Sequence, residues 1–248
     1  MRVAVMGATG RIGRYTVDAL MQSGHETVPI SRSTGVDAYT GAGLDEALVD
    51  VDVVVDVSNT RSQGETGIVD FFGTVSGNLL AAEDRAGVGH HVLLSIVGID
   101  HHQNVPHYAG KREQERRVTA GPIPWSVVRA TQFHDFAAMV AGWTLRDGTA
   151  TIAPLLVQPI AQQEVGEMLA EIATGAPLGR PIDIAGPETQ DLVDMARRTF
   201  AARGQEVRLV PTWRGPFDSS MAGEVLLPAD GARLGTVTFE DWLAAGAQ

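Results

Sequence analysis

The sequence predicts an α/β fold in which a parallel β-sheet is doubly wound, with helices on both faces. Three observations support this prediction. A strand, a glycine turn and a helical stretch follow one another over residues 3–22. Short runs rich in β-branched residues then alternate with longer helical stretches, which is the order that produces a parallel sheet. The 248 residues are 44% hydrophobic and 20% charged, the composition of a globular chain that buries a core.

Most of this alternation lies in the first 144 residues. A valine-rich run such as residues 51–57 is typical of a strand covered on both faces. Right-handed crossovers between such strands give the Rossmann topology. In chain order the pattern predicts strands at residues 3–6, 27–31, 36–38, 51–57, 91–96 and 125–129, and helices at residues 11–22, 44–48, 68–86 and 108–120, with a further helix beginning near His134.

Beyond Gly148 the alternation becomes irregular because several prolines interrupt it. The pattern there predicts helices at residues 163–174 and 189–203 and strands at residues 182–185 and 207–210. A final helix follows Thr238, which forms a capping-box pattern with Asp241. We therefore expect residues 1–150 to form the Rossmann core. Residues 151–248 would partly complete the sheet and partly form a small lobe.

Charge and composition exclude several classes of function. The 30 acidic residues outnumber 19 basic ones, and the net charge of −11 disfavours nucleic acid and anionic membrane surfaces as partners. The absence of cysteine excludes disulfides, zinc–thiolate sites and thiol nucleophiles. No apolar run is long enough to span a bilayer, and the glycine turn at residue 7 comes too early for a signal peptide. The expected location is the cytoplasm.

The sharpest motif is a glycine turn between the first strand and the first helix. In such a turn Gly7 permits the sharp exit from the strand, Gly10 lets the backbone approach a pyrophosphate, and Gly13 allows close packing of the helix on the sheet. The N–H groups and the dipole of the helix N-terminus favour an anion there. The motif predicts a dinucleotide site that includes Gly7, Thr9, Gly10, Arg11, Ile12 and Gly13.

The end of the second predicted strand indicates which dinucleotide is favoured. NAD sites usually carry an acidic residue there, about 20 residues after the glycine turn, that binds the ribose hydroxyls. This chain has Ser31 and Arg32 instead. A planar, permanently charged guanidinium suits a 2′-phosphate, and neighbouring hydroxyls can add hydrogen bonds. We expect NADP(H) as the cofactor, with NAD(H) as the alternative. Asp37 would lie near the adenine edge or in an exposed loop.

Histidines gather at residues 90–91 and 101–107, but their spacing does not indicate a metal site. A metal site needs three or four ligands that converge at fixed distances, and nothing in this spacing imposes that. Solvated loop histidines explain the pattern better, so no metal is expected. No Gly-x-Ser-x-Gly elbow surrounds Ser95, which disfavours a hydrolase.

Four segments of the chain form a familiar set. They are residues 7–13, Leu94-Ser95-Ile96-Val97-Gly98, Tyr108-Ala109-Gly110-Lys111 with Glu113 and Glu115, and the run from Pro124 to Phe133. Together they resemble the atypical short-chain dehydrogenase/reductases, and among them the NmrA-like NAD(P)-binding group. The similarity extends over nearly the whole chain. The glycine turn is shared by many families, whereas the segments from Lys111 to Phe133 are specific to this group.

This resemblance implies a cofactor that lies across the strand ends, and a substrate lobe at the C-terminus. It implies that Ser58 and Asn59 lie beside the cofactor and that Lys111 holds the nicotinamide ribose. Gln132 and Phe133 would flank the substrate pocket, which the following residue, His134, could also reach. The group resembles both reductases of quinones or small carbonyl compounds and proteins that bind the cofactor as redox sensors.

The catalytic pattern of the short-chain dehydrogenases is present only in part. In those enzymes a Tyr usually supplies the proton, a Lys four residues later lowers the pKa of that Tyr, and a Ser polarises the carbonyl. Ser95 and Lys111 match, but Tyr108 precedes the lysine by only three residues. On a helix this turns its direction by about 100°. The predicted catalytic residues are Ser95, Tyr108 and Lys111, with His107 as an alternative proton donor.

The predicted function is NADP(H)-dependent reduction of a small quinone or carbonyl compound by hydride transfer. A quinone relaxes the need for a proton donor, because a hydroquinone anion is more stable than an alkoxide. The displaced Tyr favours an alternative, a non-catalytic NADP(H)-binding redox-sensing regulator. A sugar-nucleotide epimerase or dehydratase is a weaker one. The expected partner is a small-molecule substrate, and the protein is expected to be a monomer or a homodimer.

Overall fold

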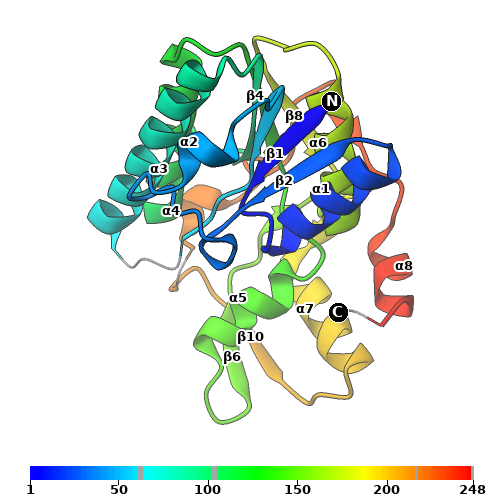
Figure 1. The fold of residues 1–248 in the computed structure, drawn as a ribbon. Helices are drawn as coiled ribbons and strands as arrows, with labels where there is room; N and C mark the ends of the chain where they lie inside the picture. Colours follow the sequence, from blue (N-terminus) through cyan, green and yellow to red (C-terminus); the bar gives the residue numbers. More distant parts are fainter. Residues whose placement is uncertain (61–63, 102–104, 216, 247–248) are drawn as a thin grey trace. The chain divides into compact units, whose positions relative to one another are not determined.

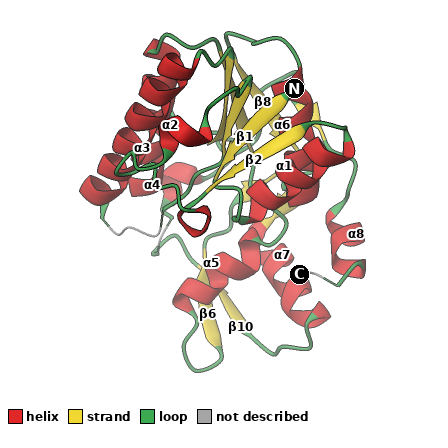
Figure 2. Cartoon of the chain, in the orientation of Figure 1, coloured by secondary structure: helices red, strands yellow, loops and turns green. Residues whose placement is uncertain are grey.

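A computed structural model describes residues 1–60, 64–101, 105–215 and 217–246. It confirms the predicted α/β fold. Seven strands form one sheet in the order β11-β8-β5-β4-β3-β1-β2, with helices beside it (Figures 1 and 2). The pairs β1–β2, β1–β3, β3–β4 and β8–β11 are parallel. The strands are β1 (Arg2–Met6), β2 (Glu26–Ile30), β3 (Val53–Asp56), β4 (His90–Ile96), β5 (Trp125–Ala130), β8 (Pro181–Ala185) and β11 (Arg233–Leu234).

The chain packs into two compact units. The first comprises Met1–Arg129 and Gln162–Ile182, and the second comprises Ala130–Ala161 and Asp183–Gln248. The units are thus interleaved along the chain, whereas the prediction used one boundary after residue 150. The first unit contains α1 (Arg11–Gln22), α2 (Leu44–Ala47), α3 (Glu65–Ala86), α4 (Pro106–Ala120), α6 (Gln162–Thr174) and the 3₁₀ turn η1 (Arg32–Thr34).

In the first unit the inner strands β1, β3 and β4 are largely buried, as the valine run predicts for β3, whereas the edge strand β2 is partly exposed. Residues 53–56 of β3 are all buried. Helices α3 and α4 lie on one face of the sheet and α1 and α6 on the other (Figure 1). Leu79 of α3 packs with Val54 and Leu93 in the core on the first of these faces. Apolar burial on two sides drives this three-layer arrangement.

The strand predicted at residues 36–38 is wrong. Asp37 forms only an isolated antiparallel bridge with Ala42, and its carboxylate accepts the N–H of Tyr39 at 2.9 Å. The segment therefore turns back on itself instead of extending along the sheet. Val36 and Ala38 are nevertheless buried in the core beside α3, which explains why their pattern resembles that of a strand.

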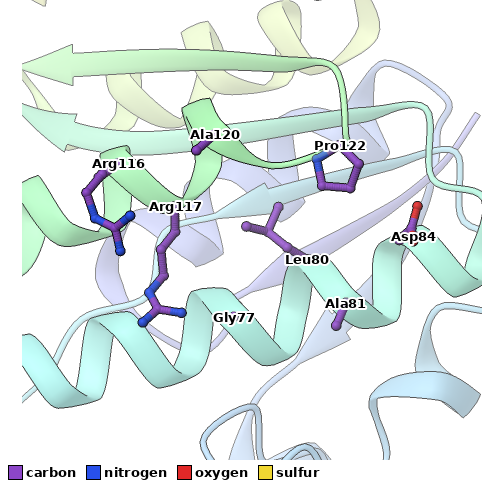
Figure 3. Close-up of a pocket in the computed structure, with 8 residues that line it drawn as sticks. All are labelled: Gly77, Leu80, Ala81, Asp84, Arg116, Arg117, Ala120 and Pro122. Carbon is purple, nitrogen blue, oxygen red and sulfur yellow. The ribbon is translucent and has the colours of Figure 1, made fainter.

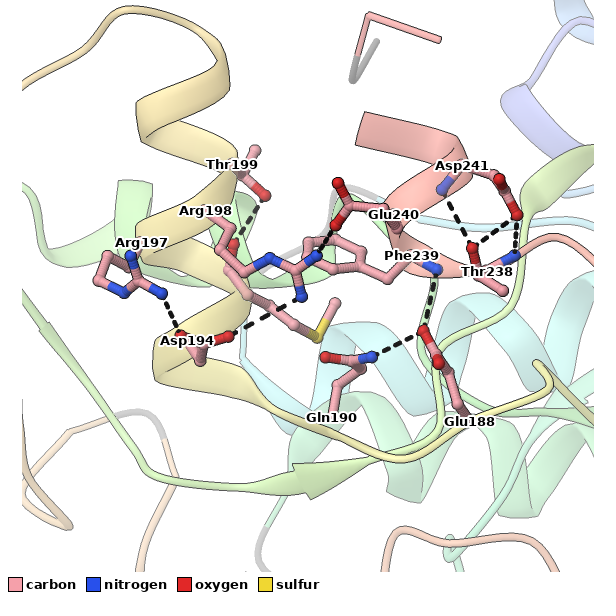
Figure 4. Close-up of polar contacts among 11 residues, drawn as sticks. Glu188, Gln190, Asp194, Arg197, Arg198, Thr199, Thr238, Phe239, Glu240 and Asp241 are labelled. Carbon is pink, nitrogen blue, oxygen red and sulfur yellow. Dashed lines mark hydrogen bonds and ion pairs between the residues drawn. The ribbon is translucent and has the colours of Figure 1, made fainter. Parts of the chain in front are cut away.

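The second unit is built from short elements. Its helix α8 (Phe239–Ala244) begins with the predicted capping box: Asp241 donates its N–H to Thr238 Oγ1 at 3.1 Å, and Thr238 donates its N–H to Asp241 Oδ2 at 3.2 Å (Figure 4). Arg198 of α7 (Leu192–Ala202) pairs with Glu240 and lies 4.9 Å from the ring centre of Phe239. The unit contains α5 (Phe136–Thr144), α7 (Leu192–Ala202), α8 (Phe239–Ala244), η2 (Ser219–Met221), β6 (Thr149–Ile152), β7 (Leu156–Val157), β9 (Gln190–Asp191) and β10 (Arg208–Pro211).

Among the described residues, none of the helices is long and apolar enough to cross a membrane.

Candidate cofactor and catalytic site

The glycine turn leads from β1 into α1, and its backbone has no room for side chains at two positions. Gly7 has φ of 85°, a conformation that favours glycine, and a Cβ there would lie 2.9 Å from Val57 O. A Cβ on Gly13 would lie only 2.2 Å from Gly7 O. Both glycines are therefore required by the close approach of the turn to β3 and of α1 to the turn.

The same turn has the properties of an anion cradle. Gly10 is the N-cap of α1, and the first turn of that helix carries no acidic side chain. Thr9, Gly10 and Arg11 are exposed, whereas Ile12 is buried beneath them. An exposed helix N-terminus without carboxylates fits the pyrophosphate of a dinucleotide.

At the end of β2 the chain forms the tight turn η1, which presents Arg32. The Ser31 N–H donates to Thr34 Oγ1 at 3.0 Å, and Ser31 Oγ lies 2.8 Å from Ser33 Oγ. These bonds fix the backbone while Arg32 itself is exposed and forms no ion pair within the described part of the chain. The arrangement leaves a cation at a strand end, as a 2′-phosphate site requires.

The end of β3 carries a buried carboxylate that the sequence analysis did not single out. Asp56 is wholly buried, and its Oδ1 accepts the Ser58 N–H at 2.8 Å. Ser58 is buried, whereas Asn59 is exposed and its Oδ1 accepts the Thr60 N–H at 2.8 Å. A carboxylate at the end of a valine run was the signal that could have revealed Asp56.

Lys111 of α4 extends to the carboxyl end of β4. Its Nζ donates to Leu94 O at 2.6 Å and to Gln114 Oε1, and it lies 5.0 Å from the ring centre of Phe72. Lys111 is only 4% exposed. Burial lowers the pKa of Lys111 to about 8, against the opposing influence of the Asp56 and Glu115 carboxylates.

Ser95 stands next to the carbonyl that Lys111 binds. It is the penultimate residue of β4, and its Oγ is buried without a hydrogen-bond partner among the described residues. Such an unpartnered hydroxyl is costly in a protein interior, and a functional role is one of the explanations for it. The structure therefore brings the predicted Ser95 and Lys111 together at one strand end.

The two predicted proton donors are poorly suited to donate at neutral pH. Tyr108 is 8% exposed, and burial raises the pKa of its hydroxyl to about 12. Burial, helped by the Lys111 charge, lowers the pKa of His107 to about 4, so its imidazole is neutral. The ring of His107 lies edge-on to Phe72, with 5.6 Å between centres.

A buried ion pair lies on the same face of the sheet and was also missed from the sequence. His91 Nδ1 lies 2.9 Å from Glu83 Oε1, and neither side chain is exposed. Burial by itself would lower the pKa of His91, but the charge of Glu83 outweighs burial, so the pKa of His91 is raised. Burial also raises the pKa of Glu83. Single residues on a helix and a strand give no sequence signal that they will meet.

The three residues predicted to flank the substrate pocket belong to the second unit. Gln132 is buried, and its backbone carbonyl accepts the Ile160 N–H at 2.9 Å. Phe133 is half-buried and precedes α5. His134 is 2% exposed, with its ring 5.8 Å from the centres of both Phe239 and Trp242. His134 thus packs in an aromatic cluster with the C-terminal helix.

This packing makes His134 a source of acid sensitivity. Burial lowers its pKa to about 4, so between about pH 6.5 and pH 4 the unfolded chain binds a proton that the folded chain does not. The free energy of unfolding should therefore decrease with falling pH across this window. We expect His134→Phe to reduce the loss between about pH 7.5 and pH 4.5 by about 2 kcal/mol, measured by urea unfolding. An identical loss in both proteins would contradict this assignment.

Among the described residues, no group of three histidines or carboxylates could hold a metal ion, and His102 lies outside those residues.

A groove between α3 and α4 is lined by residues such as Gly77, Leu80 and Arg117 (Figure 3). None of the residues that line this groove is a predicted site residue.

Comparison with known proteins gives this site its context. The profile of a family described as NAD(P)H-binding matches residues 7–175. The photosystem II assembly factor Ycf39 of Synechocystis sp. (strain ATCC 27184 / PCC 6803 / Kazusa) is 29% identical over an alignment of 149 residues, and the match covers 54% of this chain. The match spans only 45% of that relative, less than half of its length.

Two solved structures show the same fold. The NADPH-dependent quinone oxidoreductase QOR2 from Escherichia coli, complexed with NADPH, has a TM-score of 0.67 and 19% identity, over 85% of this chain and 78% of that one. A short-chain dehydrogenase/reductase superfamily protein from Agrobacterium tumefaciens with bound NAD has a TM-score of 0.71 and 16% identity, over 100% and 96%. Because the family profile matches more than half of the chain, this protein belongs to the NAD(P)H-binding family and takes NAD(P)(H) as its cofactor.

Proposed function

We propose that this protein is an NADP(H)-dependent reductase of a small quinone or carbonyl compound. The observation that carries the proposal is the bond of Lys111 to the carbonyl of Leu94, the residue before Ser95, near the carboxyl end of β4. The ammonium is fixed on the carbonyl of Leu94, and the adjacent Ser95 hydroxyl has no partner among the described residues. A hydroxyl and a cation at one strand end suit the binding of a carbonyl oxygen on which negative charge develops.

The bound nicotinamide supplies the hydride, and the protein supplies the surrounding groups. The glycine turn fits the pyrophosphate and Arg32 fits the 2′-phosphate. Ser95 donates a hydrogen bond to the substrate oxygen, and Lys111 holds the nicotinamide ribose, as the family resemblance implies. Asn59, which is exposed after β3, lies beside the cofactor in this proposal, as the family resemblance also implies.

The proton balance favours a quinone over an aldehyde or ketone. Reduction of an aldehyde or ketone gives an alkoxide, which must be protonated as it forms. That reaction therefore needs a proton donor whose pKa lies near neutral pH. Tyr108 and His107 have pKa values of about 12 and about 4, far from neutrality in opposite directions. A hydroquinone anion leaves without immediate protonation and takes its proton from solvent. The same absence of an effective Tyr argues against a sugar-nucleotide epimerase.

The test is NADPH oxidation by the purified protein with a panel of quinones, aldehydes and ketones. Turnover of quinones well above that of matched ketones is expected, because only the ketones require a donor. Faster turnover of ketones would contradict the quinone assignment. NADPH bound without oxidation by any panel member would contradict the reductase assignment itself.

The choice of cofactor is tested at Arg32. Replacing it with aspartate removes the cation and places a carboxylate beside the 2′-phosphate, so NADPH should bind at least about 100-fold more weakly. NADH binding should change little or improve, because a carboxylate at this strand end binds the ribose hydroxyls. Titration of both cofactors by fluorescence checks this. Equal losses for the two would contradict the 2′-phosphate assignment.

The second candidate is an NADP(H)-binding regulator without turnover. The observation that favours it is the depth of the catalytic groups: Ser95 is 2% exposed, and Lys111 is engaged by Leu94 and Gln114. A sensor requires tight cofactor binding and a response of the protein to the cofactor's redox state. Amide hydrogen exchange, compared between the NADPH and NADP⁺ complexes, tests this candidate. Identical protection in both complexes would contradict a redox sensor, because the protein would not respond to the redox state of the cofactor.

A further inference from the structure

Lys111 is the only lysine of the sequence, since the other 18 of the 19 basic residues are arginines. It is also buried, unlike the lysines that usually populate protein surfaces. We propose that Gln114 is the positioning residue for this lysine: its amide bridges the Lys111 ammonium and the buried Asp56 carboxylate and holds the ammonium beside Ser95. The functional part of this inference rests on the proposed reductase activity.

The geometry is that of a three-member relay. Gln114 Oε1 accepts from Lys111 Nζ, while Gln114 Nε2 donates to Asp56 Oδ2 at 2.7 Å and to Ser58 Oγ at 3.3 Å. Gln114 is wholly buried. The relay connects α4 to the ends of β3 and β4, the two strand ends at which the candidate site lies. Leu94 O completes it on the other side of the ammonium, at 2.6 Å.

A glutamine is the side chain that this position requires. It is long enough to span the two groups, and it accepts from a cation at one end while donating to an anion at the other. A carboxylate would repel Asp56, and an apolar side chain would leave an ammonium and a carboxylate buried without partners. Both sites of the amide are used, which indicates a fixed orientation.

Other charged groups face the ammonium and enter any pH dependence. The Asp56 and Glu115 carboxylates favour the charged form of Lys111. The charge of Lys111 disfavours protonation of His107 and His91. His91 in turn pairs with Glu83. The relay thus holds one cation among several titratable groups. The effect of Gln114 on the pKa of Lys111 can be separated from the effects of these groups, because Gln114 does not titrate.

The single lysine makes a direct test possible. Protein labelled with ¹³C at lysine Cε gives one side-chain signal, whose titration reports the pKa of Lys111 alone. Gln114→Met keeps the length of the side chain and removes both hydrogen bonds. The charged amine then loses an acceptor while it stays buried, so its pKa should fall by about one unit from its wild-type value. Where quinone turnover occurs, kcat should fall about tenfold.

A charge swap provides the rescue. In Asp56→Asn combined with Gln114→Glu, the new carboxylate accepts from Lys111 and from the Asn amide, and the net charge is unchanged. The pKa of Lys111 should rise above the wild-type value, and kcat should recover to within about threefold. Gln114→Glu alone sets two carboxylates side by side and should be less stable than the swap. Gln22→Met, on an exposed helical position, is the matched control and should change neither quantity.

Two results would overturn the inference: a Lys111 pKa that Gln114→Met leaves at the wild-type value in a folded protein, or a swap variant whose Lys111 pKa falls below wild type. The labelled-lysine titration needs no substrate. If the wild-type protein reduces no quinone, the proposed function fails while the titration still decides the role of Gln114.

Discussion

Replacing Lys111 with methionine is expected to lower quinone-dependent NADPH oxidation about 100-fold, because displacement of a positioning group at the reacting strand end has effects of this size. NADPH affinity should fall by a smaller factor, since the glycine turn and Arg32 are unchanged. Steady-state kinetics measure the first effect and fluorescence titration the second. A loss confined to kcat would place the lysine at the reaction rather than at initial cofactor binding.

The variant also leaves the Asp56 carboxylate buried without the nearby positive charge of Lys111. Loss of stability must therefore be separated from loss of function. The double variant Lys111→Met with Asp56→Asn removes both charges and should regain stability without regaining activity. Lys111→Arg should not restore turnover, because a guanidinium is larger and planar and cannot take the place of an ammonium between Leu94 O and Gln114. Wild-type kcat in the folded, lysine-free protein would contradict a role for Lys111 in the reaction.

Replacing Gly13 with alanine is expected to destabilise the protein by about 3 kcal/mol or more and to abolish measurable NADPH binding, because overpacking against backbone cannot be relieved by a rotamer change. The added Cβ would meet Gly7 O at 2.2 Å and Ala8 Cα at 2.8 Å. The helix must therefore move away from the turn whose N–H groups form the anion cradle. Urea unfolding and NADPH titration measure the two effects.

The chain offers a matched control in Gly142 of α5. Apart from its chain neighbours and the backbone of its own helix, no atom of the described residues lies within 4 Å of the position that its Cβ would occupy, and Gly142 is exposed. Gly142→Ala should therefore stabilise the protein slightly, by about 0.5 to 1 kcal/mol, through helix propensity. The same substitution in two helices thus has opposite expected signs. An equal, small effect at Gly13 would show that the turn is not tightly packed in solution.

Local sequence patterns were sufficient to predict most elements of the sheet. Helix α1 has the predicted bounds of residues 11–22, and the capping box of Thr238 and Asp241 forms as predicted. These features depend on residues close together in the chain: an apolar period, a glycine, a cap. The incorrect strand at residues 36–38 has the same origin, because burial beside α3 gave a turn the apolar pattern of a strand.

By itself, the sequence determined the α/β class, the glycine turn and the NAD(P)(H) family, since each shows in local patterns: the alternation of strands and helices, one short motif, and four short segments. Only the tertiary structure decided that Lys111 binds the carbonyl next to Ser95, that Tyr108 is buried, and that His134 packs against the C-terminal helix. Asp56 and Gln114 are 58 residues apart and meet because α4 packs against the neighbouring strand β4. Such contacts depend on which side chains are buried together, and burial sets both their partners and their pKa values.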